Sequence, residues 1–200
     1  MMINKTQLLG DLASISTILS FRDKSPIYRE DGNALAMTVK DLTVTWPKPV
    51  SWLQRIDVEK NQVSQSLQNG DILMPARGNF YPARYFKVSD ELVFPIGQIY
   101  VIRPHDEEIA RFLSWYLNRS QIQAKLSREV SGTTVMSLRK TSLSSLEIEI
   151  PPQEVLTKIS TITRLIEEHA LVRIQLDSAR KLESDTACEL LLKGPDCNEK

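Results

Sequence analysis

The sequence has few of the residues that build metal, redox or membrane sites. Its 200 residues include two cysteines, Cys188 and Cys197, and two histidines. A Cys-x8-Cys pair without a companion histidine or cysteine cluster lacks the ligand spacing of a zinc site, and two cysteines are too few for a disulfide framework. No apolar run approaches the roughly 18 residues of a membrane span, and residues 1–12 lack a signal-peptide core. We therefore expect an intracellular, cytoplasmic protein without a metal site or a membrane partner.

The chain also lacks net charge, because 25 Lys and Arg balance 25 Asp and Glu. This balance argues against a tail-driven nucleic-acid binder, but it leaves room for a basic face on one part of the surface. Residues 1–150 carry 18 basic and 16 acidic side chains, and the remainder carries 7 and 9. The difference is small, and its sign favours the first part as the one that contacts an anionic partner.

The motifs of common enzymes are missing as well. His105 and His169 belong to no His-x-x-x-His or Cys-His spacing, and there is no Gly-x-Gly-x-x-Gly, Walker-type Gly-Lys-Ser/Thr or Gly-x-Ser-x-Gly. The acidic run 106–108 stands at a predicted helix start, where capping and the helix dipole explain it. An enzyme without a motif remains an alternative, but the sequence nominates no catalytic residue and no bound cofactor.

Proline and glycine divide the chain near Pro151 and Pro152. Nine of the ten prolines and six of the seven glycines lie at or before Pro152, and residues 153–193 contain neither. This stretch, rich in Leu, Ile, Glu, Lys and Arg, predicts one helix of about 40 residues and about 60 Å. We expect a globular domain over residues 1–150, the long helix over 151–193, and a disordered tail over 194–200.

Residues 1–150 combine short strand-like runs with two helical stretches. Apolar or β-branched runs between turn residues predict strands, and apolar residues at helical spacing predict helices over 107–118 and 121–129. The predicted strands cover residues 34–39, 42–46, 71–75, 85–88, 92–94, 99–103 and 146–150. The fold class that follows is α+β, a mixed strand and helix domain followed by a long C-terminal helix.

The long helix has an imperfect heptad pattern, with six apolar residues at nine seam positions. The seam consists of Ile162, Leu165, His169, Val172, Leu176, Ala179, Glu183, Thr186 and Leu190. A helix too long to be covered by its own domain favours pairing with another helix, antiparallel or in a dimer, in which the interior polar residues would fix the register. The alternative is a helix that lies on its own domain with these polar residues at the edge.

Two segments carry residue types that suit DNA contact. The first runs from Arg77 to Lys87 and contains three cations, several aromatic residues and no acid. Arginine can bond guanine, asparagine can bond adenine, tyrosine can bond a phosphate, and a glycine lets the backbone approach a duplex. The candidates are Arg77, Gly78, Asn79, Tyr81, Arg84 and Lys87. Composition alone favours the alternative of a hairpin with inward aromatics and solvated cations.

The second segment places small hydroxyl residues around a glycine between cations. Such residues supply hydrogen-bond donors to phosphate oxygens. The candidates for phosphate contact are Arg128, Thr133, Thr134, Arg139 and Lys140. A solvated loop between helices, with a capping Ser or Thr, is an equally good interpretation of the same residues.

The order of motifs resembles one half of a type I restriction-modification specificity subunit, a target-recognition domain plus its conserved helix. Gly70-Asp71-Ile72-Leu73 looks like that family's Gly-Asp-Ile/Leu-Leu strand, and residues 109–126 look like its helical region. The Gly-Thr segment at 131–134 leads, as in the family, to an Ile-x-Ile-Pro ending at Ile148–Pro152. Where the family usually has Glu-Gln after the prolines, this chain has Val155-Leu156.

The resemblance implies a non-catalytic reader of double-stranded DNA. Such a chain recognises one half of a bipartite target and docks DNA adenine methyltransferase subunits, which bind the S-adenosylmethionine, and a restriction nuclease subunit can join them. With one recognition domain, the chain is expected to form a homodimer or to pair with another half-subunit through the long helix. The competing hypothesis is a coiled-coil interaction adaptor with no nucleic-acid role.

Overall fold

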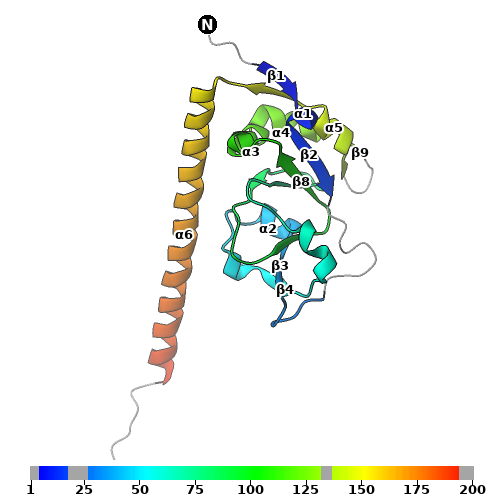
Figure 1. Cartoon of the computed structure of the whole chain (residues 1–200). Helices are drawn as coiled ribbons and strands as arrows, with labels where there is room; N and C mark the ends of the chain where they lie inside the picture. Colours follow the sequence, from blue (N-terminus) through cyan, green and yellow to red (C-terminus); the bar gives the residue numbers. More distant parts are fainter. Residues whose placement is uncertain (1–4, 18–26, 132–136, 194–200) are drawn as a thin grey trace, which may run out of the picture.

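The structure, a computed structural model, describes residues 5–17, 27–131 and 137–193. It consists of a mixed strand and helix domain followed by one long helix, α6 (Gln153–Lys193), that runs along one side of the domain (Figure 1). This architecture confirms the expected fold class. The helix has the bounds that the Pro- and Gly-free stretch predicts, and the tail over 194–200 lies outside the described residues. Within the described ranges, no helix is both long and apolar enough to span a bilayer.

The larger sheet has four strands in the order β2-β8-β5-β6, all antiparallel to their neighbours. These strands are β2 (Ala13–Thr17), β5 (Ile72–Pro75), β6 (Arg84–Tyr85) and β8 (Ile99–Pro104). Two helices, α3 (Ala110–Leu117) and α4 (Ser120–Arg128), contribute to the same core, in which Ile72 and Ile102 meet Phe112 and Leu113. Phe112, Leu113, Tyr116 and Leu117 of α3 are buried at helical spacing, which confirms the predicted amphipathic helix.

The smaller sheet has three strands in the order β4-β3-β7. Strand β3 (Ala34–Thr38) pairs antiparallel with β4 (Gln54–Ile56) and parallel with β7 (Val93–Ile96). Leu35 and Met37 face a core that includes Leu73 and Val101 of the larger sheet, whereas Ala34 and Ala36 face a separate cluster with Phe94. Alternate residues of β3 are thus buried on opposite faces, which explains its continuous apolar run.

The remaining elements are short. Strand β1 (Lys5–Leu8) pairs antiparallel with β11 (Glu147–Ile150), which leads directly into α6, and β9 (Val130–Ser131) pairs with β10 (Ser137–Leu138). The short helices are α1 (Leu9–Leu12), α2 (Val39–Thr43), α5 (Lys140–Ser144), η1 (Val50–Trp52), η2 (Lys60–Gln65) and η3 (Glu107–Ile109).

The strand predicted over residues 42–46 is wrong, because the chain forms the short helix α2 there. Thr38 donates from its backbone nitrogen and its hydroxyl to Asp41 Oδ2, at 2.8 and 2.6 Å, and so caps the helix start. Asp41 is also ion-paired with Lys48. This local capping outweighs the β-propensity of the residues that follow.

The Gly-Asp-Ile-Leu motif is an element of the fold. Gly70 has a φ of +84°, a backbone conformation that favours glycine. The carboxylate of Asp71 is fully buried and accepts two hydrogen bonds from Arg103, at 2.7 and 2.8 Å, and one from the backbone nitrogen of Gln68. The motif therefore fixes the start of β5 to the end of β8.

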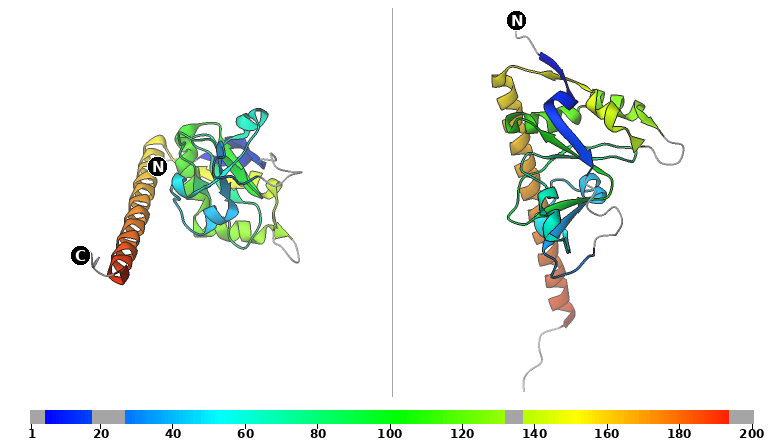
Figure 2. Two further views of the ribbon diagram at one scale, coloured as in Figure 1. Left: turned by 90° about the horizontal axis from the view of Figure 1, so that it is seen from below. Right: turned by 45° about the vertical axis from the view of Figure 1, so that its right-hand side comes forward.

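The long helix contacts its own domain along its first half only. Leu156, in the place of the family's usual Glu-Gln, is 2% exposed in the main core, and Ile159 packs partly buried against it. Residues 179–192 are all exposed. The left view in Figure 2 shows the red C-terminal end of α6 standing clear of the domain. The interpretation in which the helix lies on its own domain thus holds for the first part of α6, and pairing of the exposed part with another helix stays a prediction.

Candidate nucleic-acid interface

The two segments predicted separately as DNA contacts lie beside each other in the structure. Arg77 forms a β-bridge with Ser137, and the backbone nitrogen of Leu138 donates to the carbonyl of Ala76 at 3.0 Å. The carbonyl of Leu138 in turn accepts a 2.8 Å hydrogen bond from the hydroxyl of Tyr100. These bonds attach residues 137–138 of the second segment to Ala76 and Arg77 at the start of the first, so these parts of the two segments lie side by side.

The turn at residues 77–80 is shaped by Gly78 and Tyr81. Gly78 has a φ of +123°, and apart from its chain neighbours no atom of the described residues lies within 4 Å of the position that a Cβ would occupy. The Tyr81 hydroxyl donates to the carbonyl of Gly78 at 2.6 Å, and Tyr81 is 1% exposed. Burial raises the pKa of this phenol. Tyr81 cannot reach a phosphate from this position, so its expected role as a direct DNA contact is corrected to support of the turn.

Four of the predicted cations lie at the surface around this turn. Arg77, Arg128, Arg139 and Lys140 are all exposed, and within the described part of the chain none of them takes part in an ion pair. Unpaired cations retain their full attraction for phosphate. One acid lies near them, Glu129, which accepts a 3.2 Å hydrogen bond from the hydroxyl of Ser142.

The turn also exposes Asn79 and Phe80, of which only Asn79 was among the predicted contacts. Phe80 is 55% exposed, although the neighbouring Tyr81 and Phe86 are buried. An exposed aromatic side chain beside unpaired cations suits apolar contact with a base or a thymine methyl group. The sequence signal for Phe80 was present, because it is the aromatic residue of the turn that directly follows Asn79. The predicted contacts Thr133 and Thr134 lie outside the described residues.

Arg84 and Lys87 point to a different part of the molecule. Arg84 donates from Nε to the carbonyl of Leu42 at 3.0 Å, and its guanidinium lies 5.8 Å from the centre of the Trp46 ring. Burial lowers the pKa of Arg84, and the nearby Glu167 of α6 opposes that shift. Arg84 is therefore a contact between the domain and α6 rather than a cation of the DNA surface. The predicted segment 77–87 thus divides into two parts with different surroundings.

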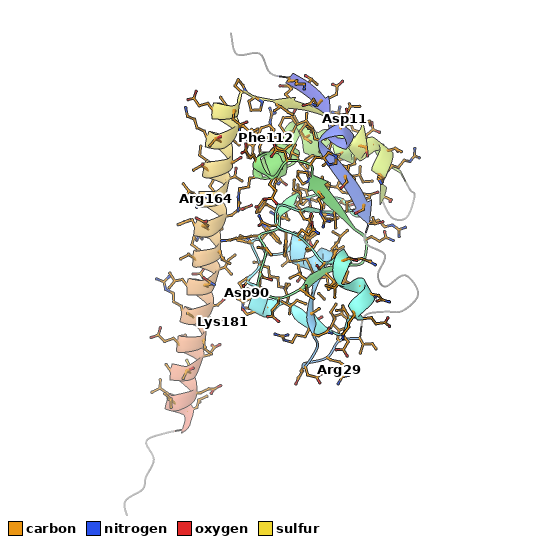
Figure 3. The ribbon with its side chains drawn as sticks, in the orientation of Figure 1. Asp11, Arg29, Asp90, Phe112, Arg164 and Lys181 are labelled. Carbon is orange, nitrogen blue, oxygen red and sulfur yellow. The ribbon has the colours of Figure 1, made fainter. Side chains whose placement is uncertain are left out.

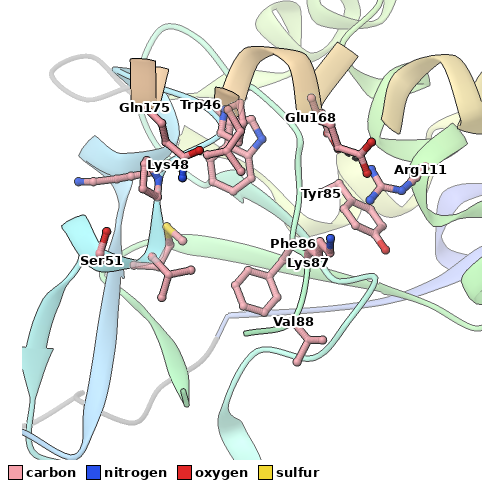
Figure 4. A pocket seen from close by; sticks show the side chains of 16 residues that line it. Trp46, Lys48, Ser51, Tyr85, Phe86, Lys87, Val88, Arg111, Glu168 and Gln175 are labelled. Atoms are coloured by element: carbon pink, nitrogen blue, oxygen red, sulfur yellow. Dashed lines mark hydrogen bonds and ion pairs between the residues drawn. The ribbon is translucent and has the colours of Figure 1, made fainter. Parts of the chain in front are cut away.

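Lys87 borders a cavity of about 290 Å³ between the domain and α6. Figure 4 shows Trp46, Lys48 and Tyr85 of the domain around it, with Glu168 and Gln175 of α6 on the other wall. Lys87 is exposed at the edge of this cavity. No group of three or more His, Cys, Asp or Glu side chains gathers at a metal-binding distance in the ranges that the structure describes.

The predicted seam of α6 is largely exposed, although Ile162 at its start lines a cavity shared with the domain. Ile162, Leu165, Val172 and Leu176 are between 47% and 61% exposed, and His169 and Ala179 are exposed as well. The seam prediction missed Ile166, which is 63% exposed on the same half of the helix. The chain therefore leaves a row of apolar side chains on α6 uncovered by its own domain.

Residues 6–174 match a family model described as "Type I restriction modification DNA specificity domain". Because the match covers most of the chain, the chain belongs to this family. No curated protein matches the sequence.

Solved structures support the same fold. The chain is similar to the S subunit of a type I restriction-modification system from M. genitalium, with a TM-score of 0.63 and 15% identity over 94% of this chain and 46% of that one. It is also similar to the HsdS subunit from Thermoanaerobacter tengcongensis, with a TM-score of 0.56 and 20% identity over 84% of this chain and 38% of that one. A third similar structure, described for the complex assembly and conformational transition of the type I R-M system, has a TM-score of 0.56 and 21% identity over 90% of this chain and 43% of that one. The chain spans less than half the length of each.

Proposed function

We propose that this chain reads one half of a bipartite DNA target as the specificity component of a type I restriction-modification complex. The observation that carries the proposal is the joining of the 77–80 turn to the β9–β10 region, which gathers exposed cations that form no ion pair with any described residue. Membership of the DNA specificity family supports it. In this proposal the chain recognises the DNA target and contributes no catalytic residue.

The surface divides into base-reading and backbone-holding parts. Arg77 and Asn79 stand on the turn at Gly78, where the absent side chain lets the backbone approach a groove. Arg139 and Lys140 stand at the start of α5, where they attract phosphates without reading sequence. Loss of a base contact changes specificity, whereas loss of a phosphate contact weakens binding to all sequences.

The exposed seam of α6 pairs with the same seam of a second chain, either a second copy or another half-subunit. His169 and Glu183 lie seven residues before and after Leu176, and Ile162 and Leu190 lie fourteen. An antiparallel pair of copies centred on Leu176 sets His169 level with Glu183 of the partner subunit. A parallel pair would set each Glu183 against its own copy, which is unfavourable because like charges repel at a low-dielectric seam.

Antiparallel pairing places two reading domains at opposite ends of a two-helix rod, related by a two-fold axis. Two copies so arranged read a palindromic split site, because the symmetry of the target mirrors that of the protein. The complex also contains adenine methyltransferase subunits, which bind the S-adenosylmethionine, and a nuclease subunit where the system restricts DNA.

The decisive experiment is co-purification with an adenine methyltransferase followed by mapping of the methylated sites. We expect one split motif, with affinity for it at least 10³-fold above that for random duplex at physiological salt. Arg77→Ala should relax one position of the motif, and Lys181→Ala, on the outer half of α6, should change nothing. Equal binding to selected and random duplexes would contradict the proposal. The adaptor alternative predicts that Arg77→Ala leaves DNA binding unaltered.

A further inference from the structure

The contact between α6 and the domain contains one half-buried ion pair that joins three elements. Arg111 on α3 donates from Nη1 to the carboxylate of Glu167 on α6, and their side chains are 16% and 22% exposed. The Arg111 guanidinium also stacks on the ring of Tyr85 in β6, 3.8 Å from its centre. Figure 4 shows Arg111 against Tyr85 on the domain side of α6. We call Arg111 and Glu167 the clamp.

A second arginine, Arg84, also attracts the Glu167 carboxylate and helps to hold it in position. Arg84 attracts Glu167 electrostatically while its own Nε is bonded to the carbonyl of Leu42 and its guanidinium lies near the Trp46 ring. Both cations that face Glu167 are thus held by groups of the domain. A carboxylate that is ion-paired with one positioned guanidinium group and attracted by a second has little freedom to shift away from them.

The packing on either side of the clamp is incomplete. Three cavities, of about 290, 350 and 400 Å³, lie between the domain and α6, and each has Arg111 or Glu167 in its lining. These cavities are open to solvent, so the α6 side chains that line them are covered by the domain only in part. The clamp is the ion pair that joins α6 to the domain among them.

The clamp lies further along α6 than the attachment near the start of the helix. There Gln153 donates to Glu108 at 2.8 Å, and Leu156 and Ile159 pack on the main core. Glu167 follows the helix start by 14 residues, about 21 Å along the axis. Two separated points fix the direction of a rod, whereas one point lets it pivot. A pivot of only about 3° moves the end of a rod of about 60 Å by about 3.4 Å, which is the rise of one base pair.

We propose that Arg111 and Glu167 are positioning residues that fix the direction of α6 relative to the reading domain, and thereby set the number of base pairs between the two halves of the target. The consequence for DNA rests on the proposed function, but the direction of the helix does not. An ion pair with this burial suits such a role, because desolvation offsets much of its stabilisation while its geometry remains specific.

Pulsed spin-label distance measurements on the full chain test the helix direction. Labels are placed at Asp90→Cys and Lys181→Cys, both visible in Figure 3, in a chain with Cys188→Ser and Cys197→Ser, diluted with unlabelled chain. We expect Arg111→Ala and Glu167→Ala each to broaden the distance distribution at least twofold, and Glu167→Gln to broaden it less because its amide oxygen still accepts from Arg111. If both alanine variants keep the original width, the proposal is overturned.

Matched controls separate the clamp from a general loss of charge or of folding. Lys158→Ala removes an exposed ion pair with Glu154 on the same helix and should leave the distribution unchanged. Glu167→Ala changes no side chain of the domain, so its unfolding in urea should remain one cooperative transition of unchanged slope even where its midpoint shifts, which shows that the domain is folded. If Lys158→Ala broadened the distance distribution as much as Glu167→Ala does, the proposal that the clamp fixes the direction of α6 would be overturned.

Methylation mapping of the same variants tests the consequence for the target. With its methyltransferase, the Glu167→Ala chain should methylate sites with the same half-site sequences but one base pair more or fewer between them, at least tenfold more efficiently than the original chain does. A broadened helix direction with unchanged spacing would overturn the link to the target. If the original complex methylates no split site, the proposed function fails, and the distance measurement still decides whether the clamp fixes the helix.

Discussion

The globular domain and α6 differ in how far their apolar side chains are buried. In the domain, residues such as Ile72 and Phe94 are fully buried in three core clusters, whereas on α6 Leu156 is 2% exposed and Leu190 is 64% exposed. The same residue type is thus a core residue at one end of the helix and a surface residue at the other. The difference teaches that the domain can fold on its own contacts, whereas the outer half of α6 gains little from folding unless another surface covers it.

The largest expected effect on the stability of the domain comes from removing its buried carboxylate, Asp71. Asp71→Ala leaves Arg103 without its partner and removes three hydrogen bonds, so we expect the free energy of unfolding in urea to fall by about 3–5 kcal/mol. Arg164→Ala, which removes an exposed ion pair with Glu168 on α6 (Figure 3), should change it by about 0.5 kcal/mol or less. A loss at Asp71 no greater than at Arg164 would contradict the structural role of the Gly-Asp-Ile-Leu motif.

Two leucines on one helix sharpen the comparison directly. Leu156→Ala creates a cavity in the main core and should lower the free energy of unfolding by about 2–5 kcal/mol. Leu190→Ala should change it by less than about 0.5 kcal/mol in dilute, monomeric protein, because the side chain is already in water. At concentrations where chains pair, Leu190→Ala should weaken association in sedimentation experiments. Equal destabilisation of the monomer by both changes would show that Leu190 is covered by the chain itself.

The smallest expected effect is a change in how stability depends on pH, and its sign differs between Asp41 of the domain and Glu167 of α6. Burial alone would raise the pKa of Asp41, but hydrogen bonds with Lys48 and Thr38 outweigh it and hold the pKa below its ordinary value. Its stabilising contribution is therefore present above the ordinary carboxyl pKa and is lost as the pH falls through the lowered one. For Glu167, burial raises the pKa against the attraction of Arg111 and Arg84. Its contribution is present below the ordinary pKa and is lost as the pH rises through the raised one.

Urea unfolding measured from about pH 3 to 7 tests these opposite signs. With Asp41→Asn, the free energy of unfolding should rise less as the pH increases. With Glu167→Gln, the fall in the free energy of unfolding that ionisation of Glu167 causes as the pH increases should disappear. The two variants therefore change the pH slope in opposite directions. Slopes that shift in the same direction would contradict the electrostatic description of one of the two sites.

Local patterns predicted the parts of the fold that depend on neighbouring residues. The helix over 153–193 follows from a stretch without proline or glycine, and Asp106 accepts a 2.9 Å hydrogen bond from the Glu108 nitrogen, as expected of a helix cap. The strand expected over 42–46 fails for an equally local reason, because the capping box of Thr38 and Asp41 lies just before it. That signal was in the sequence and was outweighed by the β-branched residues of the run.

The candidate site depended on contacts that no local pattern contains. The sequence nominated the 77–87 and 128–140 segments, but only the bridge between Arg77 and Ser137 shows that parts of them form one surface. Spacing along the chain could not reveal that Tyr81 turns inward, or that Arg84 faces α6. Each of these outcomes is set by residues more than thirty positions away or by burial, which depends on the whole core.

Residue order alone decided where helix and domain separate, which motif begins β5, and which face of α6 carries its apolar seam, because each depends on periodicity or on neighbouring residues. Folding in three dimensions decided which cations remain at the surface without partners and which side of α6 the domain occupies. Those outcomes follow from long-range pairing, since a charge is exposed or paired only once distant strands and helices have taken their places around it.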